Sequence, residues 1–323
     1  MTAGAVAQDE LETRVEKGVG YLRLNRPAAL NALSLEMLQA LSSTLAAWKH
    51  DPDISRVVMS GSGDRAFCAG ADVRPAWEHA RAGRYDAIRD YFAAEYAIDL
   101  ELATYPKPVL AVVDGICFGA GMGLAVHSSH CVATERASFS MPETLIGFFP
   151  DAGATHFLSR LPGKLGLYLG MTGARLSGAD AVFLNLAAHL VPQSRLDEAV
   201  AAFAVSGPEA VAPLAMRPDR LSLQPHVEDI NDAFSRDSVE EIFAALRRLN
   251  SPFALETLSQ LEARSPSSLR WTLESQRTGR DTNLEQCLEN ELRFVEISTR
   301  HPDFVEGVRA ALVDKDKRPR WQA

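Results

Sequence analysis

Residues 109–123 read VLAVVDGICFGAGMG, and this stretch decides the fold class. Its first five residues form a short, wholly apolar run, which is typical of a strand buried in a parallel sheet. Asp114 and Gly115 indicate a turn, and closely spaced glycines then lead into an apolar helix expected at residues 121–127. A buried strand that passes through a glycine-rich loop into a buried helix is a typical unit of α/β proteins.

A membrane-spanning helix is the alternative interpretation, because the apolar character continues to residue 126. Three glycines even have the four-residue spacing found where membrane helices pair. However, Asp114 lies in the middle of the segment, and Pro106 and Pro108 closely precede it. We therefore expect a buried strand and helix, and no association with a membrane.

The flanking sequence extends the α/β pattern in both directions. Apolar runs and helical periodicity predict strands at residues 15–24, 54–59, 132–134 and 139–142, and helices at residues 34–48 and 85–104. From residue 163 the pattern is mostly helical, and residues 208–225, with four prolines, indicate a linker. The sequence therefore predicts a core at residues 11–207 and a mostly helical C-terminal region at residues 208–323.

Composition excludes several classes of protein. Of the 323 residues, 46% are hydrophobic and 23% are charged, as in ordinary globular proteins. The net charge of −9 argues against a nucleic-acid partner, because such proteins usually carry a basic domain. Four cysteines without a CxxC pair indicate a reduced compartment, and the N-terminus lacks a signal-peptide pattern. We expect a cytoplasmic protein.

The glycine-rich loop at residues 114–123 is the first candidate site. Its spacing departs from GxGxxG, because Leu124 stands where the third glycine belongs, and no Walker lysine follows. Backbone N–H groups at such a helix start can instead stabilise a developing oxyanion. Tight packing of strand against helix explains the glycines equally well, so the loop alone leaves both interpretations open.

Two carboxylates, Glu143 and Asp151, form the second candidate, in a loop rich in apolar residues, proline and glycine. Apolar surroundings raise carboxyl pKa values into the range used for general acid–base catalysis. Two ordinary surface carboxylates are the alternative, and the loop taken alone favours that alternative.

Other catalytic patterns are weaker. His127 and His130 have the spacing of one helical turn but lack a third ligand, so we expect no metal site. No GxSxG elbow is present, which argues against a serine hydrolase. Cys68 has no histidine that can be paired with it, and we expect a small buried residue there.

Taken together, these loops resemble the crotonase (enoyl-CoA hydratase/isomerase) superfamily. The motifs are NRPAALNAL at residues 25–33, FCAGADV at residues 67–73 and DGICFGAG at residues 114–121. The resemblance narrows to the 3-hydroxyisobutyryl-CoA hydrolase family. The segments that carry this are GMGLAVH (121–127), MPET (141–144), IGFFPDAG (146–153), FLSRLPGKLGLYL (157–169), SPSSL (265–269), LENELR (288–293) and DFVEGVRAALVDKDKRPRW (303–321).

The resemblance implies a fold and a site. The fold is a crotonase-like (ββα) spiral core with additional C-terminal helices. The thioester carbonyl is held by the backbone N–H groups of Ala71 and Ala120. The first of two hydratase glutamates falls at Gly123 and is absent, whereas the second matches Glu143. The remaining implied positions are Asp151 as a further catalytic acid, Glu95 in substrate contact, Ala69, Ala71, Asp72 and Val73 at coenzyme A, and Arg26 near its phosphates.

The implied reaction is hydrolysis of a short 3-hydroxyacyl-CoA, most specifically 3-hydroxyisobutyryl-CoA in valine degradation, to the free acid and coenzyme A. No metal and no separate cofactor are expected, since coenzyme A is part of the substrate. The implied partners are the acyl-CoA and further copies of the chain, as a trimer or hexamer. Hydratase or isomerase activity on a short acyl-CoA and non-catalytic acyl-CoA binding are the alternatives.

Overall fold

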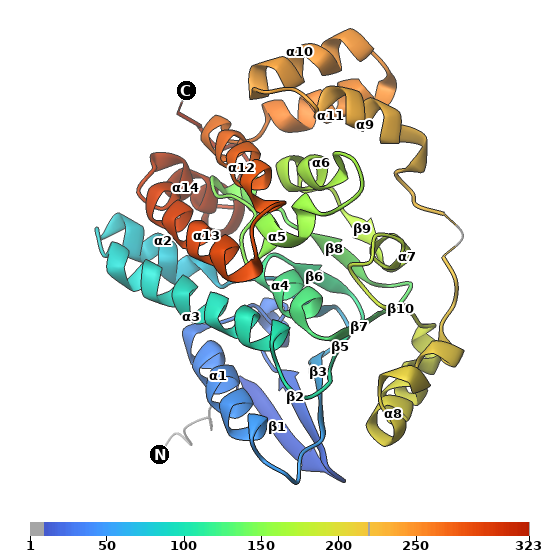
Figure 1. Ribbon diagram of the computed structural model, residues 1–323. Helices are drawn as coiled ribbons and strands as arrows, with labels where there is room; N and C mark the ends of the chain where they lie inside the picture. Colours follow the sequence, from blue (N-terminus) through green and yellow to red (C-terminus); the bar gives the residue numbers. More distant parts are fainter. Residues whose placement is uncertain (1–9, 219, 323) are drawn as a thin grey trace.

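The protein is built on two sheets, seen here in a computed structural model that describes residues 10–218 and 220–322 (Figure 1). The larger sheet has the order β1 (Leu11–Glu16), β2 (Val19–Leu24), β3 (Arg56–Gly61), β5 (Val109–Val113), β7 (His130–Ala133) and β10 (His189–Leu190). The smaller sheet has the order β4 (Ala66–Cys68), β6 (Ile116–Phe118), β8 (Ser138–Ser140) and β9 (Leu176–Ser177). Apart from the β1–β2 hairpin and the β8–β9 pair, neighbouring strands run parallel.

Each turn of the core spiral contributes one strand to each sheet and then a helix. Strands β3 and β4 are followed by α2 (Val73–Arg81) and α3 (Tyr85–Ala103), and β5 and β6 by α4 (Ala120–His127). Strands β7 and β8 are followed by α5 (Ala154–Ser159) and α6 (Leu165–Thr172). This repetition confirms the expected ββα spiral.

The central stretch folds largely as its sequence predicts. All five residues of β5 are buried, as expected for an inner parallel strand. Gly115 has φ +112° and lies directly against the Arg65 carbonyl, where a side chain has no room. This turn sends the chain from the large sheet into the small one. The sequence did not predict β6, which occupies residues first read as part of the loop.

Four further helices precede or follow the spiral in the chain. Helix α1 (Leu35–Lys49) begins where expected, with the Ser34 hydroxyl accepting a hydrogen bond from Met37 N at 3.1 Å. Helices α7 (Gly178–Phe183) and α8 (Leu196–Ser206) follow α6. Residues 208–225 contain short 3-10 turns, and α9 (Val227–Ala233) follows them.

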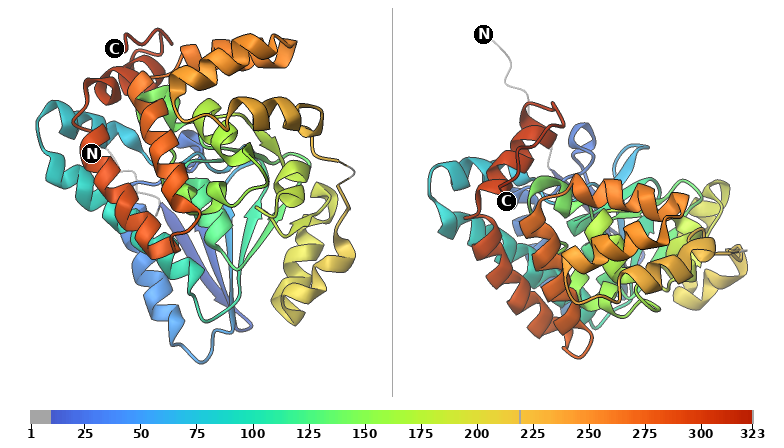
Figure 2. Two further views of the ribbon diagram at one scale, coloured as in Figure 1. Left: turned by 45° about the horizontal axis from the view of Figure 1, so that its top comes forward. Right: turned by 90° about the horizontal axis from the view of Figure 1, so that it is seen from above.

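The remaining C-terminal helices pack onto the core. They are α10 (Val239–Leu249), α11 (Pro252–Glu262), α12 (Pro266–Gly279), α13 (Leu284–Ser298) and α14 (Pro302–Val308), followed by a π-helical turn, η7 (Arg309–Val313). Helix α12 contacts α5 and α6, α13 contacts α3, and α14 contacts α2. Figures 1 and 2 show α13 and α14, in red, beside the cyan helices α2 and α3.

A shared aromatic cluster joins the C-terminal helices to the core. Phe148 stacks on Phe92 of α3 with ring centroids 5.2 Å apart, and it lies 5.8 Å from Phe304 of α14. All three side chains are almost fully buried. The loop that carries Glu143 and Asp151 is therefore enclosed between the core and the C-terminal helices.

His127 and His130 do not share a helix, because α4 ends at His127 and His130 begins β7. Among residues 10–218 and 220–322, each helix is too short or too polar to cross a bilayer.

Candidate active site

Loops after three parallel strands meet at one cavity of about 270 Å³. Strands β4, β6 and β8 are neighbours in the small sheet and run in the same direction, so their carboxyl ends lie at one edge. The cavity lining comprises Ala69, Gly70, Ala71 and Val73 after β4, Phe118, Gly119 and Ala120 at β6, Pro142, Glu143, Leu145, Ile146, Phe148 and Asp151 after β8, and Phe92, Ala311 and Leu312. The lining is mainly apolar, and its two ionisable groups are Glu143 and Asp151.

Ala71 and Ala120 line the cavity, and the local backbone pairing leaves their N–H groups available. Leu33 N donates to Gly70 O and Asp72 N donates to Leu33 O, each at 2.9 Å. In this parallel pairing, the intervening Ala71 turns its own N–H away from Leu33. Ala120 is the first residue of α4, where the N–H has no acceptor within the helix.

Gly119 brings the two loops and Glu143 together. It has φ +51° and ψ −127°, a backbone conformation that side chains oppose. A Cβ built on Gly119 would lie 2.7 Å from Oε1 of Glu143 and 3.6 Å from Cα of Gly70. Gly121 lies against the Cys68 carbonyl. The sequence left oxyanion binding and tight packing as alternatives, and this loop has the geometry for both.

Glu143 is the first residue of the 3-10 helix η2 (Glu143–Ile146) and is only 8% exposed. Its Oε2 atom is buried without a hydrogen-bond partner. Burial, followed by the charge of Asp151, raises the pKa of Glu143 well above its usual value. A carboxylate held in this way is a strong base once it is ionised.

Asp151 lies in a strained turn between η2 and α5. The next residue, Ala152, has φ +54°, and Gly153 has φ +77°. Tyr96 on α3 donates a hydrogen bond from its hydroxyl to Oδ2 of Asp151 at 2.7 Å. Burial raises the pKa of Asp151 to about 7, although this hydrogen bond opposes the rise.

Three further buried carboxyl groups surround this pair. Glu95 was expected at the site and does lie beside it on α3, but both of its oxygens are buried without a partner. It does not line the cavity. Asp99, one turn further along α3, and Glu291 of α13 were not expected. In the sequence, Asp99 stands four residues after Glu95, a spacing that places two side chains on the same face of a helix. Glu291 belongs to the LENELR segment.

Glu291 holds the turn that follows Asp151. Its two carboxylate oxygens accept hydrogen bonds from Gly153 N at 2.8 Å and Thr155 N at 2.9 Å. Nε2 of His127 lies 3.1 Å from the Ala152 carbonyl oxygen. Burial lowers the pKa of His127 to about 4, so the neutral ring donates this bond. The strained turn is thus held from α4 and from α13.

The residues expected at coenzyme A fall into two groups. Ala69 and Val73 line the cavity. Arg26, in contrast, binds Asp72 at 3.0 Å and Glu10 at 3.0 Å, and it donates to the Ala32 carbonyl. The expected phosphate role of Arg26 is disfavoured, because two carboxylates neutralise its guanidinium group. Asp72 also caps the start of α2.

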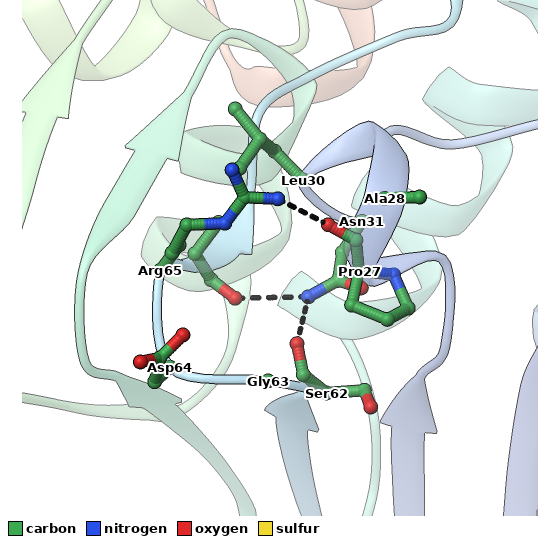
Figure 3. A pocket seen from close by; sticks show the side chains of 9 residues that line it. Pro27, Ala28, Leu30, Asn31, Ser62, Gly63, Asp64 and Arg65 are labelled. Atoms are coloured by element: carbon green, nitrogen blue, oxygen red, sulfur yellow. Dashed lines mark hydrogen bonds between the residues drawn. The ribbon is translucent and has the colours of Figure 1, made fainter.

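A second cavity, of about 190 Å³, lies next to the loop at residues 27–31 (Figure 3). Arg65 lines it, and Nη2 of Arg65 donates to the Pro27 carbonyl at 2.9 Å. No carboxylate pairs with Arg65 among the ion pairs of the described residues. Arg65 was not among the expected site residues, although it lies two residues before the FCAGADV motif.

Gly123, which stands where the resemblance places the first hydratase glutamate, has no room for a side chain. A Cβ there would lie 2.8 Å from the Ala152 Cβ and 3.1 Å from Oδ1 of Asp99. A glutamate side chain therefore has no space at this position. Within the described residues, no group of His, Cys, Asp and Glu side chains is arranged to hold a metal ion.

We predict that Gly123→Ala lowers the free energy of unfolding by about 1–3 kcal/mol, because the new methyl group overpacks against Ala152. Urea titration of the variant beside the wild type measures this loss. Gly170→Ala is the control, because Gly170 is also helical and no atom lies closer than 3.3 Å to the added Cβ, so this variant should lose less stability. Equal stability of Gly123→Ala and the wild type would contradict the close packing described here.

The comparisons with known proteins agree with this geometry. Residues 19–323 match the model of a family described as enoyl-CoA hydratase/isomerase. The chain belongs to this family. Within it, the chain is 41% identical over 317 residues to the mitochondrial 3-hydroxyisobutyryl-CoA hydrolase of Gallus gallus, covering 94% of this chain and 82% of the relative. It is 38% identical to the human mitochondrial enzyme of the same name, covering 98% and 85%.

Solved structures of this family confirm the crotonase-like fold. A carnitinyl-CoA dehydratase from Mycobacterium thermoresistibile superposes with a TM-score of 0.92 at 39% identity, over 97% of this chain and 92% of the other. An enoyl-CoA hydratase from Rhodobacter sphaeroides gives 0.89 at 36% identity, with the same coverage. The names of these relatives point to different reactions on coenzyme A thioesters, so the side chains of the site carry the functional argument.

Proposed function

We propose that this protein hydrolyses 3-hydroxyisobutyryl-CoA to 3-hydroxyisobutyrate and coenzyme A. The observation that carries the proposal is the pairing of Glu143 and Asp151 in an apolar cavity, while Gly123 has neither an acid nor room for one. Hydration of a double bond at this site uses two glutamates, and only one is present. The curated relatives at 38% and 41% identity, which are 3-hydroxyisobutyryl-CoA hydrolases, support the same reaction.

The thioester carbonyl oxygen accepts hydrogen bonds from the N–H groups of Ala71 and Ala120. As the carbonyl carbon becomes tetrahedral, its oxygen becomes anionic, and these fixed donors stabilise the charge. Glu143 lies beside the same loop through its contact with Gly119. Two routes fit this placement. Either Glu143 attacks the carbonyl carbon, expels the thiolate and forms an anhydride that water opens, or it removes a proton from a water that attacks directly.

Both routes consume one water and release coenzyme A and the hydroxy acid. The thiolate leaves without a strong general acid, so the chemistry calls for no metal and no separate cofactor. Ala69 and Val73 line the cavity, and Arg65 in the second cavity offers a cation for the phosphates of coenzyme A. The proposal includes no nucleic acid or membrane partner.

Asp151 either binds the substrate hydroxyl group or positions the attacking water, and we expect Asp151→Asn to lower kcat by about 10²-fold. The effect of this substitution on substrate preference distinguishes the two roles. If Asp151 binds the hydroxyl, the wild type prefers 3-hydroxyisobutyryl-CoA over isobutyryl-CoA and the variant loses that preference. If Asp151 positions water, both substrates slow equally. Coenzyme A release, followed with a thiol reagent, measures both rates. Unchanged rates on both substrates would exclude a catalytic role for Asp151.

The setting of the reaction is part of the proposal. We place the enzyme in valine degradation, the pathway implied by the family resemblance. The cytoplasmic location remains a prediction, and the animal relatives are described as mitochondrial. A trimer or hexamer likewise remains a prediction.

An enoyl-CoA isomerase activity is the second candidate, because one carboxylate base is enough for it and Glu143 is retained. Both solved relatives described above carry hydratase or dehydratase names. A non-catalytic acyl-CoA binder is disfavoured, since binding needs the two N–H groups and not a pair of buried carboxyl groups.

A further inference from the structure

Tyr96 on α3 makes the side-chain hydrogen bond that orients Asp151. The hydroxyl of Tyr96 donates to Oδ2 of Asp151 at 2.7 Å, and Tyr96 is only 4% exposed. Its ring packs against Phe92 with centroids 6.1 Å apart, and Phe92 in turn stacks on Phe148. The donor is therefore fixed by the same aromatic cluster that encloses the cavity.

Tyr96 and Asp151 lie among several other buried acids. The titratable groups that face Asp151 are Tyr96, Glu95 and Asp99 from α3, Glu143 from η2 and Glu291 from α13, with His127 of α4 bonded to the neighbouring Ala152. Both carboxylate oxygens of Glu291 accept hydrogen bonds from backbone N–H groups. The carboxyl oxygens of Glu95 and Asp99 have no hydrogen-bond partner. None of these acids takes part in an ion pair among the described residues.

We propose that Tyr96 is a positioning residue that fixes the Asp151 carboxylate in the orientation in which it contacts the substrate hydroxyl or the attacking water. This inference rests on the proposed hydrolase function. An ionised carboxylate accepts about four hydrogen bonds, so the bond from Tyr96 leaves Asp151 free to contact the substrate from the cavity. A short hydrogen bond to a carboxylate is also stronger than one between neutral groups.

The same hydrogen bond affects the pH at which Asp151 ionises. A hydrogen bond to the charged form lowers a carboxyl pKa, and the Tyr96 bond does so for Asp151. Without it, only the backbone hydrogen bond at Asp151 opposes the effect of burial. The pKa of Asp151 then rises above about 7. Activity that needs the ionised carboxylate should consequently move to higher pH.

Tyr96→Phe tests the proposal, because it removes only the hydroxyl group. Tyr105→Phe is the matched control: Tyr105 is also buried and donates to a backbone carbonyl, that of Leu45, at 2.7 Å, away from the site. We expect Tyr96→Phe to lower kcat near neutral pH about tenfold with little change in KM. The acidic limb of its pH profile should shift upward, and part of the loss should disappear at high pH. Tyr105→Phe should keep the wild-type kcat and profile.

The outcomes separate this inference from the proposed function. If the wild type releases coenzyme A and Tyr96→Phe behaves like Tyr105→Phe, Tyr96 is only a core residue. If the wild type releases none, the proposed function fails, and the free energy of unfolding still tests Tyr96.

A carboxyl group whose pKa is higher in the folded than in the unfolded chain makes the fold less stable as pH rises toward the folded pKa. The stability gap between Tyr96→Phe and the wild type should thus widen above about pH 7. A gap that stays constant, as expected for Tyr105→Phe, would overturn the inference.

Discussion

Glu143→Gln should abolish coenzyme A release, with a fall in kcat of about 10³-fold or more, because the amide can neither attack a thioester nor accept a proton from water. The shape of the site should survive, since glutamine is isosteric. Steady-state release of coenzyme A measures the loss, and binding of the thioester should persist. Asp180→Asn is the control: Asp180 is another buried carboxylate, but it is bonded to Ser177 and Ser222 outside the cavity.

The same variant should be more stable than the wild type. Burial raises the pKa of Glu143 above its value in the unfolded chain, so ionisation of Glu143 destabilises the fold progressively once pH exceeds that unfolded value. Glutamine removes this penalty, and the melting temperature of Glu143→Gln should therefore exceed that of the wild type at neutral pH. An active Glu143→Gln enzyme, or an inactive Asp180→Asn enzyme of normal stability, would contradict the role given to Glu143.

Gly119→Ala should lower kcat by about 10²- to 10³-fold, the usual loss when one oxyanion donor is displaced. The new methyl group would lie 2.7 Å from Oε1 of Glu143, and φ of +51° is strained for alanine. To relieve both, the loop must move, and the Ala120 N–H moves with it. One substitution therefore disturbs the base and the oxyanion donor together.

Gly83→Ala is the matched control for this variant. Gly83 also has a positive φ, +69°, but no atom lies within 4 Å of the added Cβ. Both variants bear backbone strain of about 1 kcal/mol or somewhat more, and both should show it in urea titrations. Only Gly119→Ala should lose coenzyme A release. Equal activity of the two variants would mean that Gly119 serves packing alone, as the sequence allowed.

Much of this site could be predicted from local sequence. The strand at residues 109–113, the turn at Gly115 and the helix after Gly119 each depend on residues close in the chain, and they form where periodicity and glycine placement indicate. Glu143 and Asp151 also lie on one stretch of ten residues. The backbone donors at Ala71 and Ala120 came from the family resemblance, because alanine gives no signal of its own.

The rest depends on contacts between distant segments. Glu291 lies well over a hundred residues from the Gly153 N–H that it binds, and neither residue signals the other. Tyr96 reads as one more apolar position of α3 until the fold brings Asp151 to its hydroxyl. The ion pairs of Arg26 could not be predicted either, because its carboxylate partners Glu10 and Asp72 come from elsewhere in the chain.

The same long-range packing excludes a second glutamate at position 123. Ala152 and Asp99 fill the space in which an acid at Gly123 would have to stand. Our account consequently depends on a site with one glutamate, one aspartate and two backbone donors.

In the most direct measurement, the purified wild-type protein is incubated with 3-hydroxyisobutyryl-CoA and, in parallel, with crotonyl-CoA. A thiol reagent reports coenzyme A release, and the absorbance of the enoyl thioester reports hydration. We predict rapid release of coenzyme A from 3-hydroxyisobutyryl-CoA and no hydration of crotonyl-CoA. Hydration of crotonyl-CoA without release of coenzyme A from either thioester would contradict the account, and so would binding of both thioesters with neither reaction.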